Sequence, residues 1–256
     1  MGTLFLVATP IGNLGDVSSR ALEVLASVDF IACEDTRQTI KLLNHFGIRK
    51  PLISYHDFNE EKKAEVLIEK LEGATKIALV SDAGTPAIAD PGYRIVRLCR
   101  LRGIHVIPIP GPSALIAAVS ASGLPTDEFM FLGFLPAKKH ARRERLRTLA
   151  DMNCTLVFYE APHRIEEMLE DLQAVLGDRA VFVAREITKI HEESFFGRLS
   201  EVRPLVKALG EFVVVLGGAI ETQTRIPATR EEVLKKLGMT RNELYDLFFK
   251  KQNSAS

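Results

Sequence analysis

Short runs of apolar, β-favouring residues recur along this 256-residue chain, and segments with helical periodicity lie between them. Most of these runs are continuously apolar rather than alternating, which is typical of strands covered by helices on both faces. The alternation of such strands with helices predicts an α/β fold whose strands pair mainly in parallel. The expected strands cover residues 3–9, 30–34, 76–82, 105–110, 129–134, 155–160, 180–186 and 212–216. The expected helices cover residues 17–27, 36–46, 60–71, 94–102, 113–121, 142–150, 164–176 and 201–209.

The stretch "ASGLPTDEF" (residues 121–129) divides the chain, because Gly and Pro end a helix there before a new strand begins. It predicts two α/β domains, residues 1–121 and 122–222. The remaining residues, 223–256, are predicted to form a short helical tail module. Thr229 with Glu232, and Thr240 with Glu243, each have the spacing of a helix capping box.

Composition excludes several classes of protein. Lys and Arg together number 33, as do Asp and Glu, so the net charge gives no general argument for nucleic-acid binding. Cys33, Cys99 and Cys154 are scattered and form no CxxC pair, which argues against a structural zinc site. The first residues contain no basic leader, and no apolar run approaches the length that spans a bilayer. We therefore expect a cytoplasmic protein that has no membrane partner and binds no metal.

Three loops at predicted strand ends are rich in glycine and proline: "VATPIGNLGD" (7–16), "SDAGTPAIADPG" (81–92) and "PIPGPSA" (108–114). Ligands of open α/β sheets bind at the carboxyl ends of the strands, where such residues let the backbone approach a ligand closely. Any one of these loops, taken singly, is more typical of a tight strand–helix connection than of a ligand site. None is a Walker loop or a GxGxxG motif. Three of them together favour a small-molecule pocket whose ligand the residues alone do not identify.

These loops and several other stretches resemble the tetrapyrrole methylase superfamily, whose members use S-adenosylmethionine. The further matching stretches are "CEDTR" (33–37), "GFLP" (133–136), "YEAPHR" (159–164), "REITK" (185–189) and "GEFVVVLGG" (210–218). Within the superfamily the chain is similar to the branch that methylates the 2′-hydroxyl of a cytidine in the decoding centre of 16S ribosomal RNA. The resemblance implies two α/β domains with S-adenosyl-L-methionine in the cleft between them. It also implies a homodimer.

The resemblance further implies which residues lie near the cofactor. From the three loops these are Thr9, Pro10, Asp82, Ala83, Gly84, Ser113 and Ala114. Backbone groups are expected to carry much of the binding.

Charged residues at other predicted strand ends are the candidate catalytic groups, namely Glu160, Arg164, Lys189 and Asp35. Each also has a structural interpretation. Glu160 and Arg164 would pair to cap the helix that follows, Lys189 would lie in a solvated strand connection, and Asp35 would cap a helix. A proton acceptor assists an attacking hydroxyl, so the candidates for that role are Glu160, Asp35, and Lys189 if it is neutral.

The run "KKHARRERLR" (138–147) concentrates positive charge in a chain of zero net charge. Arg142, Arg143 and Arg145 are the candidate RNA-binding residues, since phosphate contacts give most nucleic-acid affinity. The alternative is a solvated helix face.

The resemblance, with which the basic run agrees, implies a 2′-O-methyltransferase that acts on 16S ribosomal RNA in the small ribosomal subunit. Two alternatives stay open: a methyltransferase of the same fold that acts on a tetrapyrrole or a protein side chain, and a non-enzymatic RNA-binding assembly protein. A nucleotide-dependent enzyme of another class is disfavoured, because the chain has no phosphate loop.

Overall fold

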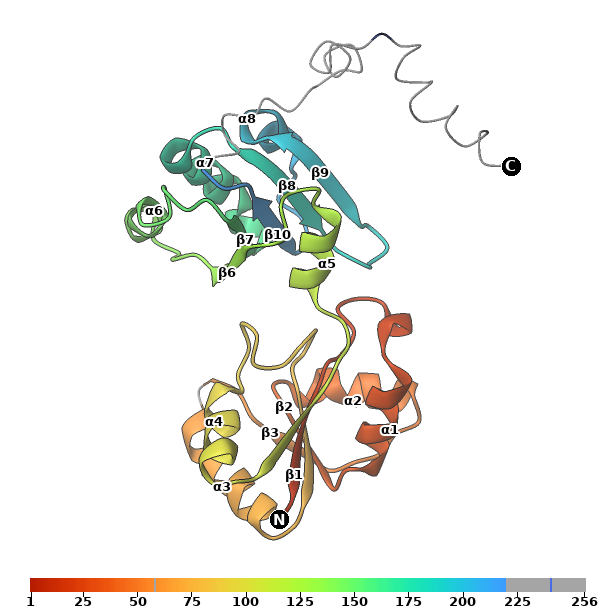
Figure 1. The fold of residues 1–256 in the computed structure, drawn as a ribbon. Helices are drawn as coiled ribbons and strands as arrows, with labels where there is room; N and C mark the ends of the chain where they lie inside the picture. The colour runs from red at the N-terminus through yellow and green to blue at the C-terminus, as the bar shows by residue number, and fades with distance from the viewer. Residues whose placement is uncertain (58, 220–239, 241–256) are drawn as a thin grey trace, which may run out of the picture.

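The computed structural model describes residues 1–57, 59–219 and Thr240, and these form two five-stranded sheets with helices packed on them (Figure 1). The first sheet has the order β3-β2-β4-β1-β5 and the second the order β6-β7-β10-β8-β9. The predicted tail lies outside the described residues apart from Thr240.

The elements of the first half are β1 (Thr3–Val7), α1 (Ser19–Ser27), β2 (Phe30–Cys33), α2 (Thr36–His45), β3 (Leu52–Ser54), α3 (Glu60–Glu72), β4 (Lys76–Val80), α4 (Tyr93–Leu101) and β5 (His105–Ile109). Those of the second are α5 (Ala114–Ala121), β6 (Phe129–Phe134), α6 (Lys139–Arg147), β7 (Thr155–Glu160), α7 (Ile165–Leu176), β8 (Ala180–Arg185), β9 (Glu193–Arg198), α8 (Leu199–Val202) and β10 (Phe212–Leu216).

The first sheet is parallel throughout, as predicted. Its strands are apolar on both faces because helices cover both faces. Leu4 and Ile77 belong to the core cluster that includes α3 and α4 residues, whereas Val7 and Ile31 belong to the cluster that includes α1 and α2 residues. The parallel arrangement brings the carboxyl ends of β1, β4 and β5 to one edge of the sheet.

The second sheet is mixed, so the prediction of mainly parallel pairing is wrong for this half. Strands β6 and β7 are parallel, but β10 runs antiparallel between β7 and β8, and β9 is antiparallel to β8. Parallel neighbours need a crossover connection of about a dozen residues or more, and only residues 186–192 separate β8 from β9. The predicted helix 201–209 is reduced to α8 and a 3₁₀ turn that contains Pro204, whose ring disfavours a continued helix.

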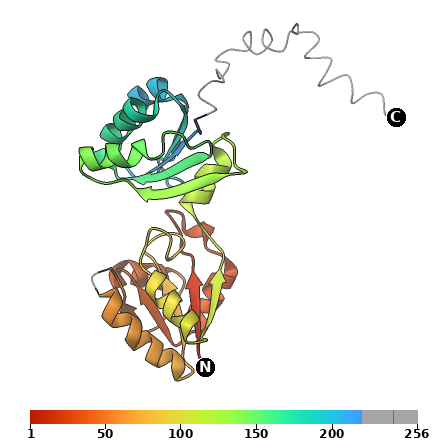
Figure 2. The same ribbon diagram turned by 60° about the vertical axis from the view of Figure 1, so that its left-hand side comes forward.

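Helix α5 packs on the second sheet, although the predicted boundary at residues 121/122 assigns it to the first domain (Figures 1 and 2). Its residues Leu115, Ala118 and Val119 share one core cluster with Val157 and Val213 of the second sheet. We therefore propose that the domain boundary lies between β5 and α5. None of the described helices combines the length and the apolar character needed to cross a bilayer.

Candidate active site

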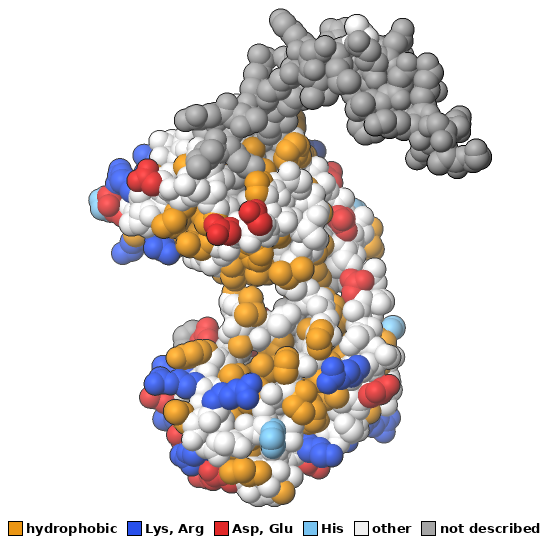
Figure 3. Space-filling model, in the orientation of Figure 1, with side chains coloured by type: hydrophobic (Ala, Val, Ile, Leu, Met, Phe, Trp, Pro, Cys, Tyr) orange, Lys and Arg blue, Asp and Glu red, His pale blue; other side chains and the backbone are white. Residues whose placement is uncertain are grey.

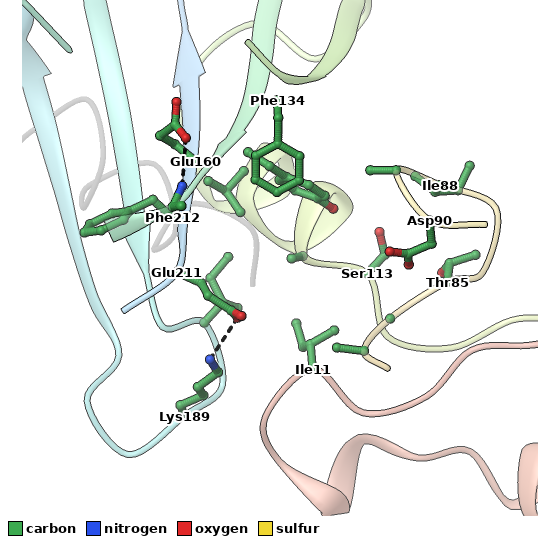
Figure 4. Close-up of a pocket in the computed structure, with 18 of the residues that line it drawn as sticks. Ile11, Thr85, Ile88, Asp90, Ser113, Phe134, Glu160, Lys189, Glu211 and Phe212 are labelled. Carbon is green, nitrogen blue, oxygen red and sulfur yellow. Dashed lines mark hydrogen bonds and ion pairs between the residues drawn. The ribbon is translucent and has the colours of Figure 1, made fainter. Parts of the chain in front are cut away.

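A cavity of about 330 Å³ lies between the two halves, and both contribute to its walls (Figures 3 and 4). The first half supplies residues from the loops after β1, β4 and β5, which are the three glycine- and proline-rich loops of the sequence. The second half supplies the start of α5, the ends of β6 and β7, the β8–β9 connection and the start of β10. The apolar part of the wall includes Ile11, Ile88, Phe134, Ile187 and Phe212.

Hydrogen bonds join the first two loops to each other. The Thr9 N–H donates to the Gly84 carbonyl at 2.9 Å, and the Gly84 N–H donates to the Thr9 carbonyl at 3.0 Å. The Thr9 hydroxyl donates to the Ser81 carbonyl at 3.2 Å. Gly84 has a φ of +83°, which glycine adopts at no steric cost. Thr9 is buried and fixes these loops from beneath the cavity.

Four of the seven residues predicted to contact the cofactor line the cavity: Ala83, Gly84, Ser113 and Ala114. Thr9, Pro10 and Asp82 are not among the lining residues. The small side chains leave backbone groups accessible, and Ser113 caps the amino end of α5 by accepting from the Ile116 N–H at 3.4 Å. These residues fit S-adenosylmethionine, because the cavity has apolar walls for a large organic group and small residues that leave backbone N–H and C=O groups within its reach.

Asp90 lines the cavity but was not singled out from the sequence. Figure 4 shows its carboxylate directed into the cavity beside Ser113. Burial raises the pKa of Asp90 to about 6, and the nearby carboxylates of Asp82 and Asp57 add to this effect against a hydrogen bond with Ser81. Asp90 stands before a proline within "ADPG" and therefore looks like an ordinary turn residue. The sequence feature that could have identified Asp90 is its position in the same loop as Ala83 and Gly84.

Contacts with its own neighbours hold the Glu160 carboxylate, which favours the structural interpretation over the predicted catalytic role. Glu160 lines the cavity wall, but its carboxylate accepts from the Ala161 N–H at 2.9 Å and lies 3.3 Å from the Arg164 guanidinium. Figure 4 shows it turned away from Lys189. The Arg164 guanidinium donates to the Leu135 carbonyl at 2.6 Å, and Arg164 is not a lining residue. The two side chains therefore form the ion pair of the structural alternative, although no side-chain hydrogen bond caps α7 as that alternative expected.

Lys189 lines the cavity as a charged group. Burial lowers the pKa of Lys189, but ion pairs with Glu186 at 2.8 Å and Glu211 at 2.9 Å outweigh this effect and raise it overall. Lys189 therefore stays charged, and a charged ammonium group cannot accept a proton. The aliphatic part of the Lys189 side chain packs against Gly12 of the first half. A Cβ added at Gly12 would lie 2.3 Å from Lys189 Cγ, so this contact between the two halves requires glycine.

Asp35 lies outside the cavity lining and acts as the N-cap of α2. Its carboxylate accepts from the Arg37 backbone N–H at 2.8 Å and pairs with the Arg37 guanidinium at 2.7 Å. The hydrogen bonds from the Arg37 side chain and backbone lower the pKa of Asp35 to about 2. Such a weak base is a poor proton acceptor, and capping was the alternative interpretation of this residue.

The basic run forms α6, and its arginines differ in exposure. Arg142 is fully buried, so the prediction that it contacts RNA is wrong: its guanidinium donates to Asp171 at 2.7 Å and to Glu167 at 3.0 Å. Arg143 is partly exposed and also donates to Asp171, at 2.6 Å. Arg145 is exposed and hydrogen-bonds Thr148 at its own end of the helix. The residues before them, Lys138, Lys139 and His140, are exposed as well.

The fold and this cavity define a two-half α/β protein built to bind a small molecule between its sheets. Residues 3–203 match the model of the Tetrapyrrole (Corrin/Porphyrin) Methylases. The chain therefore belongs to the tetrapyrrole methylase family. This membership confirms the predicted family and fold class, and with them a methyltransferase that uses S-adenosylmethionine.

Similar proteins are found among curated sequences and solved structures. The chain is 53% identical over 226 residues to "Ribosomal RNA small subunit methyltransferase I" of Xylella fastidiosa, which covers 86% of this chain and 83% of that protein. It is 49% identical over 249 residues to the protein of that name from Escherichia coli O157:H7, covering 95% and 86%. Diphthine synthase shares the fold with a TM-score of 0.66 at 18% identity, covering 85% of this chain and 90% of that one.

Proposed function

We propose that the chain transfers a methyl group from S-adenosylmethionine to the 2′-hydroxyl of a cytidine in the decoding region of 16S ribosomal RNA. The observation that carries the proposal is sequence identity to small-subunit ribosomal RNA methyltransferases. About half of the aligned residues are identical, and the alignments cover most of both chains. The cavity supports it, because the loops of the resemblance meet there.

The bound cofactor would supply an electrophilic methyl group on its sulfonium. Ala83, Gly84 and Ala114 would hold it through backbone groups, with the apolar walls excluding water. Fixing the hydroxyl and the methyl carbon in line can contribute several kcal/mol to lowering the barrier. The chain's remaining task is to remove the proton of the attacking hydroxyl.

We assign that task to Asp90. The carboxylate lies in the cavity, and a pKa of about 6 makes it a better base than an ordinary aspartate while it remains ionised at neutral pH. This carboxylate would take the proton of the 2′-hydroxyl while the methyl group passes to the oxygen, its bond to sulfur breaks and S-adenosylhomocysteine is left. Lys189 stays charged, the Asp35 carboxylate is too weak a base, and the Glu160 carboxylate is turned away.

The exposed cations on and just before α6 are proposed to contact RNA phosphates. Arg145, Lys138 and Lys139 lead this set, and Arg142 is removed from it. The protein is proposed to act in the cytoplasm as a homodimer, on RNA assembled in the small ribosomal subunit. A tetrapyrrole substrate and a purely binding role are both disfavoured by the similarity to ribosomal RNA methyltransferases.

The test uses small ribosomal subunits that lack the modification, isotope-labelled S-adenosylmethionine and the purified protein. Mass mapping of nuclease fragments should place one labelled methyl group on a cytidine ribose. The matched variant Asp90→Asn should bind the cofactor but transfer methyl groups ~10²–10⁴-fold more slowly. Methylation of a base, or of no ribosomal RNA, would overturn the proposal.

A further inference from the structure

Phe134 is a large aromatic side chain that the fold leaves exposed at the cavity. It ends β6, lines the cavity and is 55% exposed. Its ring meets the edge of Tyr159, with the centroids 5.9 Å apart at an interplanar angle of 63°. Tyr159 is itself fixed, because its hydroxyl accepts from the Leu115 N–H at 3.1 Å. Tyr159 therefore holds the Phe134 ring at the edge of the cavity, and much of the Phe134 ring stays exposed.

The segment after Phe134 is held in place by two guanidinium groups that the proposed chemistry does not use. Arg164 donates to the Leu135 carbonyl at 2.6 Å, and Arg142 donates to the Ala137 carbonyl at 3.1 Å. Each guanidinium is paired with a buried carboxylate, Glu160 for the first and Asp171 for the second. A rigid segment loses little conformational freedom when a ligand binds, which favours binding through Phe134.

Positively charged residues begin at Lys138, a few residues after Phe134 in the chain. Lys138, Lys139 and His140 are exposed at the start of α6. Proteins that hold single-stranded nucleic acid combine aromatic rings, on which bases stack, with cations along the phosphates. A 2′-hydroxyl can enter a cavity between two sheets only if its nucleotide leaves the helical stack, and the exposed base then needs a new stacking partner.

We propose that Phe134 is the surface on which the base of the target nucleotide stacks while its ribose enters the cavity. This inference rests on the proposed function and adds the residue that receives the extruded base. Glu160, Arg164, Arg142 and Asp171 are positioning residues that hold the Phe134 segment. Stacking requires a flat side chain, so Phe134→Tyr should preserve the function and Phe134→Leu should remove it.

The test compares Phe134→Leu, Phe134→Tyr and the control Phe196→Leu. Phe196 lies on β9, is 50% exposed and does not line the cavity, so it matches Phe134 in type and exposure. Two measurements are made on each variant: kcat/KM for unmodified small ribosomal subunits, and the affinity for S-adenosylhomocysteine by calorimetry. Stacking is worth about 1–3 kcal/mol per base, so kcat/KM should fall ~5- to 150-fold in Phe134→Leu. Phe134→Tyr and Phe196→Leu should stay within about threefold of the parent, well below that loss.

The outcomes separate the inference from the function on which it rests. An unchanged S-adenosylhomocysteine affinity with reduced kcat/KM in Phe134→Leu supports stacking of the substrate base. A matching loss of S-adenosylhomocysteine affinity shows instead that Phe134 covers the cofactor and overturns the inference. Normal turnover by Phe134→Leu overturns it as well. Failure of the parent itself to methylate the subunits overturns the proposed function and this inference with it.

Discussion

Replacement of Arg142 by alanine is expected to destabilise the protein strongly, although the residue belongs to a run that looks like a surface patch. Arg142 and Asp171 are both fully buried, and the guanidinium makes three hydrogen bonds, to Asp171, Glu167 and the Ala137 carbonyl. Removing one partner of a buried ion pair costs about 3–5 kcal/mol, because the other charge stays buried.

The contacts of Arg142 indicate that the cost of Arg142→Ala lies near the lower end of that range. Arg143 would still donate to the second Asp171 oxygen, and Glu167 is 66% exposed and can return to water. We therefore expect a loss of about 3 kcal/mol in the free energy of unfolding. A protein of this size loses ~2–4 °C in melting temperature per kcal/mol, so the loss corresponds to roughly 6–12 °C.

Urea denaturation followed by circular dichroism measures this loss, and Arg145→Ala provides the matched control on the same helix. The exposed control should change the free energy of unfolding by less than about 0.5 kcal/mol. Replacing both members of the pair, in Arg142→Met with Asp171→Leu, should recover most of the loss, since apolar residues of similar volume often replace a buried ion pair without cost. Equal denaturation midpoints for Arg142→Ala and Arg145→Ala would refute the reasoning.

The other predictions concern the cavity and its surroundings. In the parent, kcat/KM should fall about tenfold per pH unit below the Asp90 pKa of about 6, because the protonated carboxyl cannot accept a proton. Asp90→Asn should be slow at every pH, and an unaltered pH profile in this variant would assign the titration to another group. Ala114→Trp should abolish cofactor binding in calorimetry without lowering the melting temperature, and normal binding would move the cofactor site elsewhere. Lys139→Ala with Arg145→Ala should reduce the salt dependence of RNA binding by up to about one unit of log–log slope per lost phosphate contact while leaving cofactor affinity unchanged. A slope equal to the parent's would make α6 a solvated face.

The sequence predicted four of the five strands of the first half, because these strands are covered on both faces and read as continuous apolar runs. The short strand β3, "LIS", was missed because three residues, none of them fully buried, give too little pattern. The sequence predicted the second half less well. The strand β9, "ESFFGR", was missed because none of its residues is fully buried and it lacks a continuous apolar run. The direction of β10 could not be predicted, since a buried strand has the same apolar composition whichever way it runs.

For the candidate site, the sequence predicted which loops lie at the pocket but not which charged side chains face it. The glycine- and proline-rich loops were predicted to form the pocket, because the carboxyl ends of parallel strands share one edge of a sheet. Whether a charged side chain faces the cavity depends on contacts that sequence spacing does not reveal. Glu160 and Arg142 illustrate this point, since each is held by neighbours within its own half, and Asp90 was overlooked within a turn.

The place of β10 in the second sheet has a consequence for synthesis on the ribosome. This strand is the last in the part of the chain that the structure describes, yet it lies at the centre of its sheet between β7 and β8. The first sheet is complete once Ile109 has emerged, so that half can fold while translation continues. The second sheet has no central strand until residues 212–216 emerge. Because Phe212 and Val213 also line the cavity, a nascent chain acquires its complete binding site only after these residues have emerged, long after the first sheet can fold.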